Sequence, residues 1–410
     1  MRDPLTLLAA ILLSASCGAP AAAATRAGGL PALAAAARSI LGAGQGVYVE
    51  ASDGTPLLAQ AAARPVHPAS VSKVPTTLAL LRKFGPEHRF TTTFSGTGPI
   101  EGGTLAGNLL VSSDGDPYFV DENALLVAER LNQLGIRRVT GTLQPLGALT
   151  FDWQDDTDAA RLRLALSGSV PAAAWAALRD LNATAPAAGP VPSIQFLNGA
   201  DPGTAPPRPL VIHRSQPLLT LAKALNDYSN NIFKPLADAA GGAAAVEALA
   251  RSVVPADMRS EITLGDGAGT DPRNRLSPRA AVKLLRALEL ELTASGHALV
   301  DILPVAGIDT GTLQQRLSAP DEAGRVVGKT GTFGDYGASA LIGAIATGDR
   351  GTVYFAILNH GVPVPEARRR QDRFLHALLG QLHAVPWNYR RDALPAVARA
   401  EALLAGGALP

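Results

Sequence analysis

Runs of apolar residues with strand character lie towards the two ends of the chain, and helical patterns lie between them. The strand-like runs are residues 46–50, 56–61, 325–332, 338–347 and 352–359. Asp53-Gly54 separates the first two and is typical of a hairpin turn, while Gly-rich turns between the last three favour an antiparallel meander. This order predicts an α/β fold of the α+β type, with one antiparallel sheet and helices on its faces.

Two helical patterns adjoin these strands. The first begins after Pro68 and stops at Gly85-Pro86, and its apolar stripe consists of Val74, Leu78 and Leu81. Pro75 falls near its first turn, where proline is either tolerated or bends the helix. The second pattern, residues 366–382, follows the last strand and is expected to cover the sheet.

The texture of the chain changes at about residue 90. Thr- and Gly-rich strand-like sequence is followed by a helical pattern over residues 121–134, and then by Ala/Pro/Gly-rich sequence with little periodicity. We assign residues 91–208 to an inserted subdomain beside a main domain formed by residues 25–90 and 209–390. Residues 391–410 are interpreted as a C-terminal tail.

The N-terminus resembles a secretory signal peptide. An apolar run over residues 5–13 follows Arg2, and small residues continue to a cleavage site at Ala22-Ala23-Ala24. The run is too short to cross a bilayer comfortably. We therefore expect residues 1–24 to be removed and the mature protein to be exported, periplasmic or cell-wall associated, without a stable membrane span. A retained N-terminal anchor is the alternative.

Composition narrows the chemistry. The single cysteine, Cys17, lies in the signal segment, so cleavage leaves no thiol for disulfides, catalysis or metal binding. Lipidation of Cys17 is disfavoured because Ser14 stands where a lipid box has leucine. A formal net charge of +1 and the lack of a long basic run argue against nucleic acid as a partner. The seven histidines are scattered, so neither a metal nor another cofactor is expected.

The first of three short motifs is Ser70-x-x-Lys73, at the start of the predicted helix. Residues three apart on a helix are neighbours, so the Ser70 hydroxyl and the Lys73 amine would lie within reach of each other. Serine becomes an effective nucleophile when a base accepts its proton, and a buried lysine with a lowered pKa can serve as that base. Alone, this motif is weak, because an ordinary amphipathic helix start contains it by chance.

The second motif is Ser229-x-Asn231, on a polar loop between helical segments. A second hydroxyl can relay a proton to the leaving amine, and an amide can hold a peptide carbonyl, although turns also favour these residues. The third is Lys329-Thr330-Gly331-Thr332, in a strand-like run. Lys329 supplies charge and Thr330 and Thr332 supply hydroxyls suited to a carboxylate, while Gly331 allows a ligand to approach the strand.

In this order the three motifs are the signature set of penicillin-interacting serine enzymes. The chain resembles the D-alanyl-D-alanine carboxypeptidase/endopeptidase family of low-molecular-mass class C penicillin-binding proteins. The segments that carry the resemblance are PASVSK, GNLLVSSDGDP, DYSNN, DGAGTD, LPVAGIDTGTL and VVGKTGTFGDYG. The resemblance implies the penicillin-binding/β-lactamase-like transpeptidase fold with an inserted smaller domain. It also implies peptidoglycan stem peptides and β-lactams as binding partners.

The family's residue roles carry over motif by motif. Ser70 would be the nucleophile, Lys73 its general base and Ser229 the group that passes a proton to the departing D-alanine. Asn231 would hold the substrate amide. The terminal carboxylate would be bound by the third motif, at Lys329, Thr330 and Thr332, with Gly331 between them. Backbone N–H groups of Ser70 and Thr332 would form the oxyanion hole.

This chain departs from the family pattern at two further points. The insertion between the first two motifs is shorter than is common in the family, so a role for it in docking peptidoglycan is doubtful. The family's D-G-S-G appears as Asp266-Gly267-Ala268-Gly269, where Ala268 lacks the hydroxyl.

Two alternative functions stay open from the residues alone. A β-lactamase or related esterase shares this fold, and Tyr228-x-Asn230 overlaps the Ser229-x-Asn231 frame in the manner of one β-lactamase type. A non-catalytic peptidoglycan-binding module is disfavoured because all three motifs are intact. The sequence leaves open the oligomeric state and the balance of carboxypeptidase against endopeptidase activity.

Overall fold

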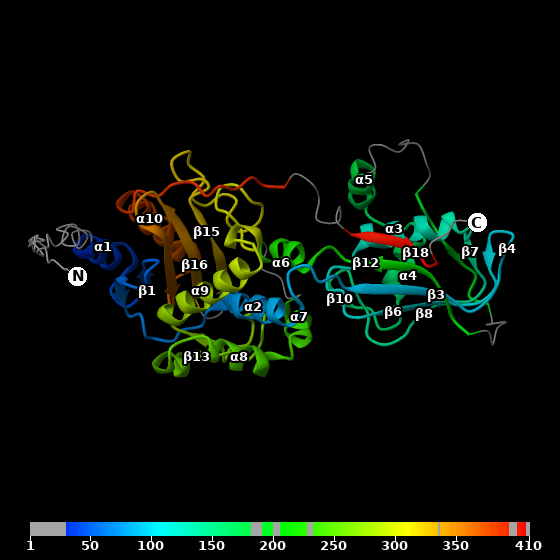
Figure 1. Ribbon diagram of the computed structural model, residues 1–410, viewed down its shortest axis with the longest axis horizontal. Coiled ribbons are helices and arrows are strands. Elements are labelled where there is room, and N and C mark those ends of the chain that lie inside the picture. The colour runs from blue at the N-terminus through cyan, green and yellow to red at the C-terminus, as the bar shows by residue number, and fades with distance from the viewer. Residues whose placement is uncertain are drawn as a thin grey trace, which may run out of the picture.

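The protein is elongated, and two lobes lie along its long axis (Figure 1). This computed structural model describes residues 30–181, 191–199, 206–227, 233–334, 337–392 and 400–406. The chain leaves the first lobe after residue 84 and returns to it at residue 218. Among the residues described, no helix combines the length and the apolar character needed to cross a bilayer.

The first lobe is built on an antiparallel sheet with the strand order β15-β16-β17-β1-β2. These strands are β1 (Gly46–Glu50), β2 (Pro56–Gln60), β15 (Val326–Phe333), β16 (Ala338–Thr347) and β17 (Gly351–Asn359). The predicted hairpin and meander are confirmed, and β1 pairs with β17 in the register Gly46↔Leu358. The two ends of the chain therefore meet in one sheet, as the order of the strands predicts.

Helices cover both faces of this sheet because apolar residues alternate along its central strands. On β16, Leu341 and Ile345 belong to one core, whereas Ile342 and Ala344 belong to the other. The helices on the first face are α1 (Leu30–Ala36), the π-helix η2 (Ala37–Leu41) and α10 (Val364–Gln381). The helices on or beside the second face are α2 (Lys73–Phe84), α6 (Leu218–Asp227), α7 (Phe233–Ala239), α8 (Ala243–Ser252) and α9 (Pro278–Ala294).

Short elements complete the first lobe. They are the 3₁₀ turns η3 (Ala69–Ser72), η4 (Ala256–Glu261) and η5 (Leu299–Asp301), and the paired strands β13 (Ile262–Thr263) and β14 (Arg275–Leu276). Pro75 is the third residue of α2, directly after the 3₁₀ turn η3, and α2 continues past it to Phe84. Proline is therefore tolerated at this position.

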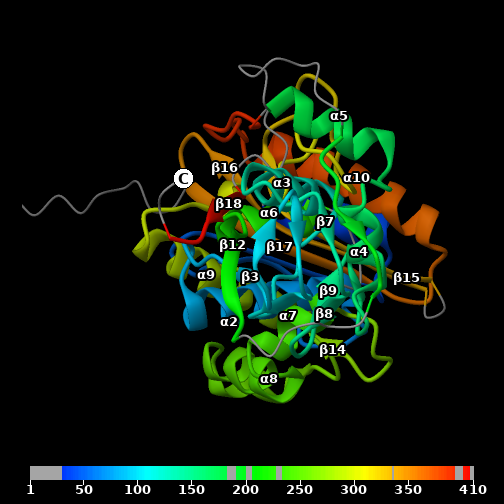
Figure 2. The ribbon, with the colours of Figure 1, turned by 90° about the vertical axis from the view of Figure 1, so that its right-hand side faces the viewer.

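The second lobe has its own apolar core, formed around Phe94, Phe119 and Leu131. Its strands are β3 (Thr91–Gly96), β4 (Ile100–Glu101), β5 (Thr104–Leu105), β6 (Leu109–Ser113), β7 (Arg138–Val139), β8 (Leu143–Pro145), β9 (Thr150–Phe151), β10 (Gln154–Asp155), β11 (Gln195–Phe196) and β12 (Arg208–Arg214). Its helices are α3 (Asp121–Gln133), α4 (Ala160–Leu166) and α5 (Ala172–Leu181). Viewed from this end, β3 and β12 lie side by side (Figure 2), in agreement with their antiparallel pairing.

One strand of the second lobe comes from the far C-terminus. β18 (Glu401–Leu404) pairs antiparallel with β12, and Ala402 is buried in the core of this lobe. The interpretation of residues 391–410 as a tail is therefore wrong at residues 401–404. The apolar run there is too short to be recognised as a strand without knowledge of its partner.

Candidate active site

The first motif forms the tight turn that begins the helix after Pro68. The turn opens as the 3₁₀ segment η3 and continues as α2 from Lys73. Side chains three residues apart are eclipsed in a 3₁₀ turn. Lys73 Nζ consequently lies 3.1 Å from Ser70 Oγ, and both side chains are buried. The predicted Ser–Lys contact is present.

The surroundings of Lys73 favour its neutral form. Burial lowers the pKa of Lys73 to about 8, an effect that the charge of Asp266 partly opposes. The Phe233 ring acts in the opposite direction, because its centre lies 5.2 Å from the amine and an aromatic face attracts a cation. A lysine whose pKa lies near neutral pH can accept a proton from Ser70, as a general base requires.

A buried histidine holds the backbone just before the nucleophile. Ala69 has φ = 48°, in the left-handed region, and its N–H donates to His67 Nδ1 at 3.1 Å. Because Nδ1 accepts, Nε2 carries the proton and donates to the Asp271 carbonyl at 3.0 Å. The imidazole stacks on Phe333 with 4.6 Å between ring centres, and burial lowers its pKa. His67 is thus a neutral hydrogen-bonded residue that positions the turn.

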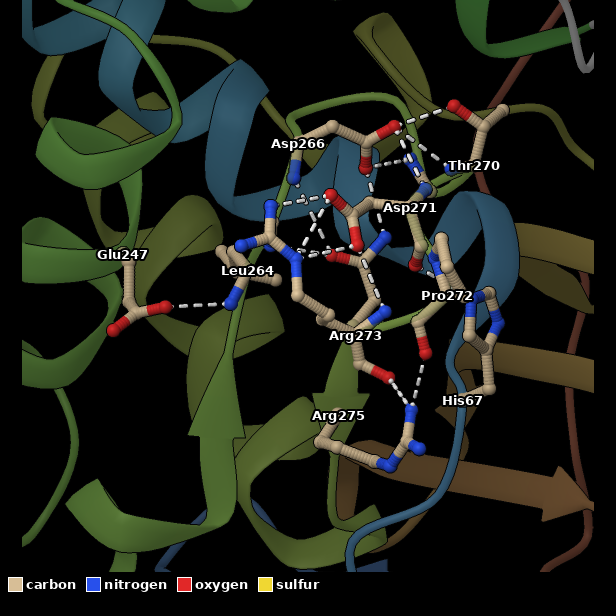
Figure 3. Close-up of polar contacts among 12 residues, drawn as sticks. His67, Glu247, Leu264, Asp266, Thr270, Asp271, Pro272, Arg273 and Arg275 are labelled. Atoms are coloured by element: carbon tan, nitrogen blue, oxygen red, sulfur yellow. Dashed lines mark hydrogen bonds and ion pairs between the residues drawn. The ribbon is translucent and has the colours of Figure 1, made fainter.

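The loop from Asp266 packs against this turn, and Figure 3 shows its polar contacts. The Asp266 carboxylate accepts from the N–H groups of Gly269, Thr270 and Asp271, and from the side chains of Thr270 and Asn274. Burial raises the pKa of Asp266, but these hydrogen bonds outweigh it and the pKa falls below its usual value. The carboxylate therefore serves to hold the loop in shape.

The glycines of this loop permit close contact with the turn that carries Ser70. Gly269 has φ = 92°, and a Cβ there would lie 2.1 Å from the Ala69 carbonyl oxygen. Thr76 Oγ1 donates to the Gly267 carbonyl at 2.9 Å. Ala268, where the family has serine, is buried in the apolar core. The replacement of serine by alanine at this position therefore affects the packing of the first lobe.

The third motif lies on β15, which stands at one end of the sheet within the described chain. Lys329 is fully buried, and its amine donates to the Thr330 carbonyl at 3.1 Å. Burial and then the charge of Lys73 lower the pKa of Lys329 to about 7, against the opposing charge of Asp227. The Thr330 and Thr312 hydroxyls are 2.7 Å apart. The effect of Lys73 on the pKa of Lys329 shows that the two amines lie close together.

Gly331 brings β15 against the nucleophile. A Cβ on residue 331 would lie 2.6 Å from the Pro68 carbonyl oxygen and 3.0 Å from the Ser70 backbone nitrogen. The sequence predicts that this glycine allows a ligand to approach the strand; the structure shows that a glycine is also needed here for packing within the protein. Thr332 follows, and its Oγ1 accepts from the Arg368 guanidinium at 2.7 Å. Arg368 belongs to none of the three motifs, so no sequence signal marks it.

Ser229 and Asn231 lie outside the described residues, together with the rest of 228–232. The residues that flank this gap are placed. Asp227 ends α6, its carbonyl accepts from the Thr312 N–H at 3.0 Å, and its charge acts on Lys329. Phe233, on the other side, lies beside Lys73. Both flanks of the second motif are therefore next to the two lysines of the other motifs.

Known structures share this fold. The penicillin G-acylated predatory endopeptidase Bd3459 of Bdellovibrio bacteriovorus, solved with immunity protein Bd3460, matches with a TM-score of 0.73 at 22% identity, covering 87% of this chain and 99% of that chain. The predatory endopeptidase Bd0816 from the same organism gives 0.72 at 22% identity, with coverages of 87% and 99%. Penicillin binding protein 4 of Haemophilus influenzae gives 0.59 at 18% identity, also with 87% and 99%.

A family model gives a more specific result than the fold. The model of the D-Ala-D-Ala carboxypeptidase 3 (S13) family matches residues 30–159 and 164–379, which include both lobes, the Ser70–Lys73 pair and the whole of β15. The sequence-based resemblance to serine DD-peptidases is confirmed, and it decides against the β-lactamase alternative. The chain therefore belongs to the D-Ala-D-Ala carboxypeptidase 3 (S13) family and is a hydrolase of the serine DD-peptidase type.

Proposed function

We propose that this enzyme cleaves the D-Ala-D-Ala bond of peptidoglycan stem peptides through an acyl-enzyme on Ser70. The carrying observation is the 3.1 Å contact between Ser70 Oγ and a buried Lys73 whose pKa is lowered to about 8. Lys73 takes the serine proton as Ser70 attacks the scissile carbonyl. The N–H groups of Ser70 and Thr332 stabilise the oxyanion that forms.

The other motifs complete the proposed cycle. Ser229 passes a proton to the departing D-alanine, so the peptide C–N bond breaks and leaves the acyl group on Ser70. Asn231 holds the substrate amide. The substrate C-terminus lies along β15, where Lys329, Thr330 and Thr332 bind it. Water then hydrolyses the ester and regenerates the Ser70 hydroxyl.

Covalent labelling by penicillin G tests this proposal. The β-lactam amide takes the place of the D-Ala-D-Ala bond, and a similar fold has been solved in its penicillin G-acylated state. We expect intact-mass spectrometry to show one adduct on the wild-type protein and none on Ser70→Ala. Lys73→Ala should slow acylation by roughly 10²–10⁴-fold, the range for a lost general base.

Ser72→Ala is the matched control, because it removes a neighbouring buried hydroxyl that has no hydrogen-bond partner among the described residues. It should acylate at close to the wild-type rate. A wild-type protein that forms no adduct, or an undiminished adduct on Ser70→Ala, would contradict the proposal. Mass analysis of products from purified muropeptides then distinguishes loss of terminal D-alanine from cutting of cross-links.

We also propose export to the periplasm or cell wall, where peptidoglycan lies. The support is the signal-like sequence of residues 1–24. Mass spectrometry of the protein recovered from the exported fraction should give a mature N-terminus near Thr25. A full-length chain, or one carrying a diacylglyceryl group on Cys17, would refute this.

A further inference from the structure

Arg368, on α10, presents a positive charge next to the last residue of the third motif. Its guanidinium donates to Thr332 Oγ1 at 2.7 Å, and the residue is partly covered by its neighbours but still open to solvent. Within the described part of the chain, it forms no ion pair with a carboxylate. A neutral hydroxyl does not compensate the charge of a guanidinium, which stays protonated in proteins.

Three arginines near Arg368 have acidic partners. Arg316 donates to the Asp372 carboxylate at 2.6 Å and to the side chain of Gln371. Arg369 and Arg370 both pair with Glu366. Partial burial, and then the neighbouring charge of Arg316, lower the pKa of Arg368, while Asp372 opposes this. Of this group, Arg368 is the cation that is available to an anionic ligand.

The position of Arg368 relative to Ser70 matches the length of one substrate residue. Gly331 lies against the Ser70 backbone, and Thr332 is one residue farther along β15, a step of about 3.8 Å. In a D-Ala-D-Ala peptide, the terminal carboxylate belongs to the residue that follows the scissile carbonyl. A substrate lying along β15 with its carbonyl at Ser70 would therefore bring this carboxylate near Thr332 and Arg368.

Lys329 is less suited to supply this charge. Its side chain is fully buried, its amine donates to the Thr330 carbonyl, and its pKa is lowered to about 7. A guanidinium also matches a carboxylate geometrically, because it can donate two parallel hydrogen bonds.

We propose that Arg368 binds the C-terminal carboxylate of the substrate, with the Thr332 hydroxyl orienting its guanidinium. The inference rests on the proposed function, because it assumes a peptide acylating Ser70. Arg368 is then the residue that makes the enzyme select peptides whose leaving residue carries a free carboxylate.

The test compares a diacetyl-L-Lys-D-Ala-D-Ala peptide with its C-terminal amide. Wild type should prefer the acid in kcat/KM. Arg368→Gln should lower kcat/KM for the acid by about 10- to 100-fold, the cost of a lost charge-assisted hydrogen bond, and for the amide by less than about threefold. Arg369→Gln makes the same charge change one residue along the helix and should leave the acid-to-amide ratio unchanged. Arg368→Lys should restore part of the preference.

Two results would overturn the inference. One is an acid-to-amide ratio in Arg368→Gln equal to that of wild type. The other is an equal loss of preference in Arg369→Gln, which would indicate that the positive charge of α10 in general, and not Arg368, acts on the substrate. The penicillin adduct separates this inference from the proposed function: an acylated Ser70 with an unchanged ratio contradicts only the role of Arg368, whereas no adduct on the wild-type protein contradicts the proposed function.

Discussion

Gly331→Ala tests how closely β15 packs on the turn that carries Ser70. The added Cβ would lie 2.6 Å from the Pro68 carbonyl oxygen and 3.0 Å from the Ser70 nitrogen. Both are backbone atoms, so neither can rotate away as a side chain would. An ordinary contact of 3.4 Å with the Pro68 oxygen requires the strand and the turn to separate by about 0.8 Å.

Under the proposed function this separation acts directly on catalysis, because Ser70 and the third motif would then contact the same substrate. A misplacement of about 1 Å can cost about 100-fold in rate. We therefore expect Gly331→Ala to slow penicillin acylation of Ser70 by roughly 10- to 100-fold. Overpacking should also lower the free energy of unfolding by about 1–3 kcal/mol. The measurements are the time course of the adduct by intact mass and urea unfolding.

Two glycines of the same region serve as controls. A Cβ on Gly334 meets no described atom within 4 Å, so Gly334→Ala should match wild type in both measurements. A Cβ on Gly328 would lie 2.2 Å from the Ile342 carbonyl oxygen, between strands of the sheet. Gly328→Ala should therefore destabilise the protein with a smaller effect on the acylation rate of folded molecules. Wild-type acylation in Gly331→Ala, or a loss no larger than that in Gly328→Ala, would refute the reasoning.

Three further predictions concern proton transfer and support of the turn. Burial lowers the pKa of Lys73 to about 8, and the neutral amine is the form that accepts a proton. The rate of acylation should therefore rise with pH through about 8 and then level off. An acylation rate that falls over this range contradicts a base role for Lys73. Ser229→Ala should lower turnover of a D-Ala-D-Ala peptide by on the order of 10²-fold or more, the scale of a lost proton-transfer group. Tyr228→Phe should lower it by less than about tenfold. The reverse order of the two losses would favour the Tyr228-x-Asn230 frame. His67→Ala leaves the Ala69 N–H without its imidazole acceptor and should lower the free energy of unfolding by about 1–3 kcal/mol in urea, whereas no measurable change would show that another group supports the turn.

The three motifs could be found in the sequence because each is local. The spacing of Ser70 and Lys73 predicts their contact, since any helical turn brings residues three apart together. The strands of the first lobe could likewise be predicted, because alternation of apolar residues is a property of each segment. The order of the motifs then identified the family.

Other features depended on segments far apart in the sequence. Arg368 meets Thr332 across 36 positions, and nothing in either segment marks the pair. The packing of Gly331 against the Pro68 carbonyl is visible only in the folded chain, and β18 is recognisable as a strand only beside β12. The lowered pKa values of Lys73 and Lys329 also arise from burial, which follows from the packing of several elements.

The sequence by itself therefore determined the type of fold, the candidate nucleophile with its candidate base, and the peptidase family. These follow from local spacing and from short motifs whose residue types carry their own chemistry. Only the tertiary structure decided which lysine amine is buried beside which group, why residue 331 packs best as glycine, and which arginine donates to Thr332 near the end of β15. These properties depend on distances between segments that are remote in sequence and on how deeply side chains are buried. Both are set only when the chain folds.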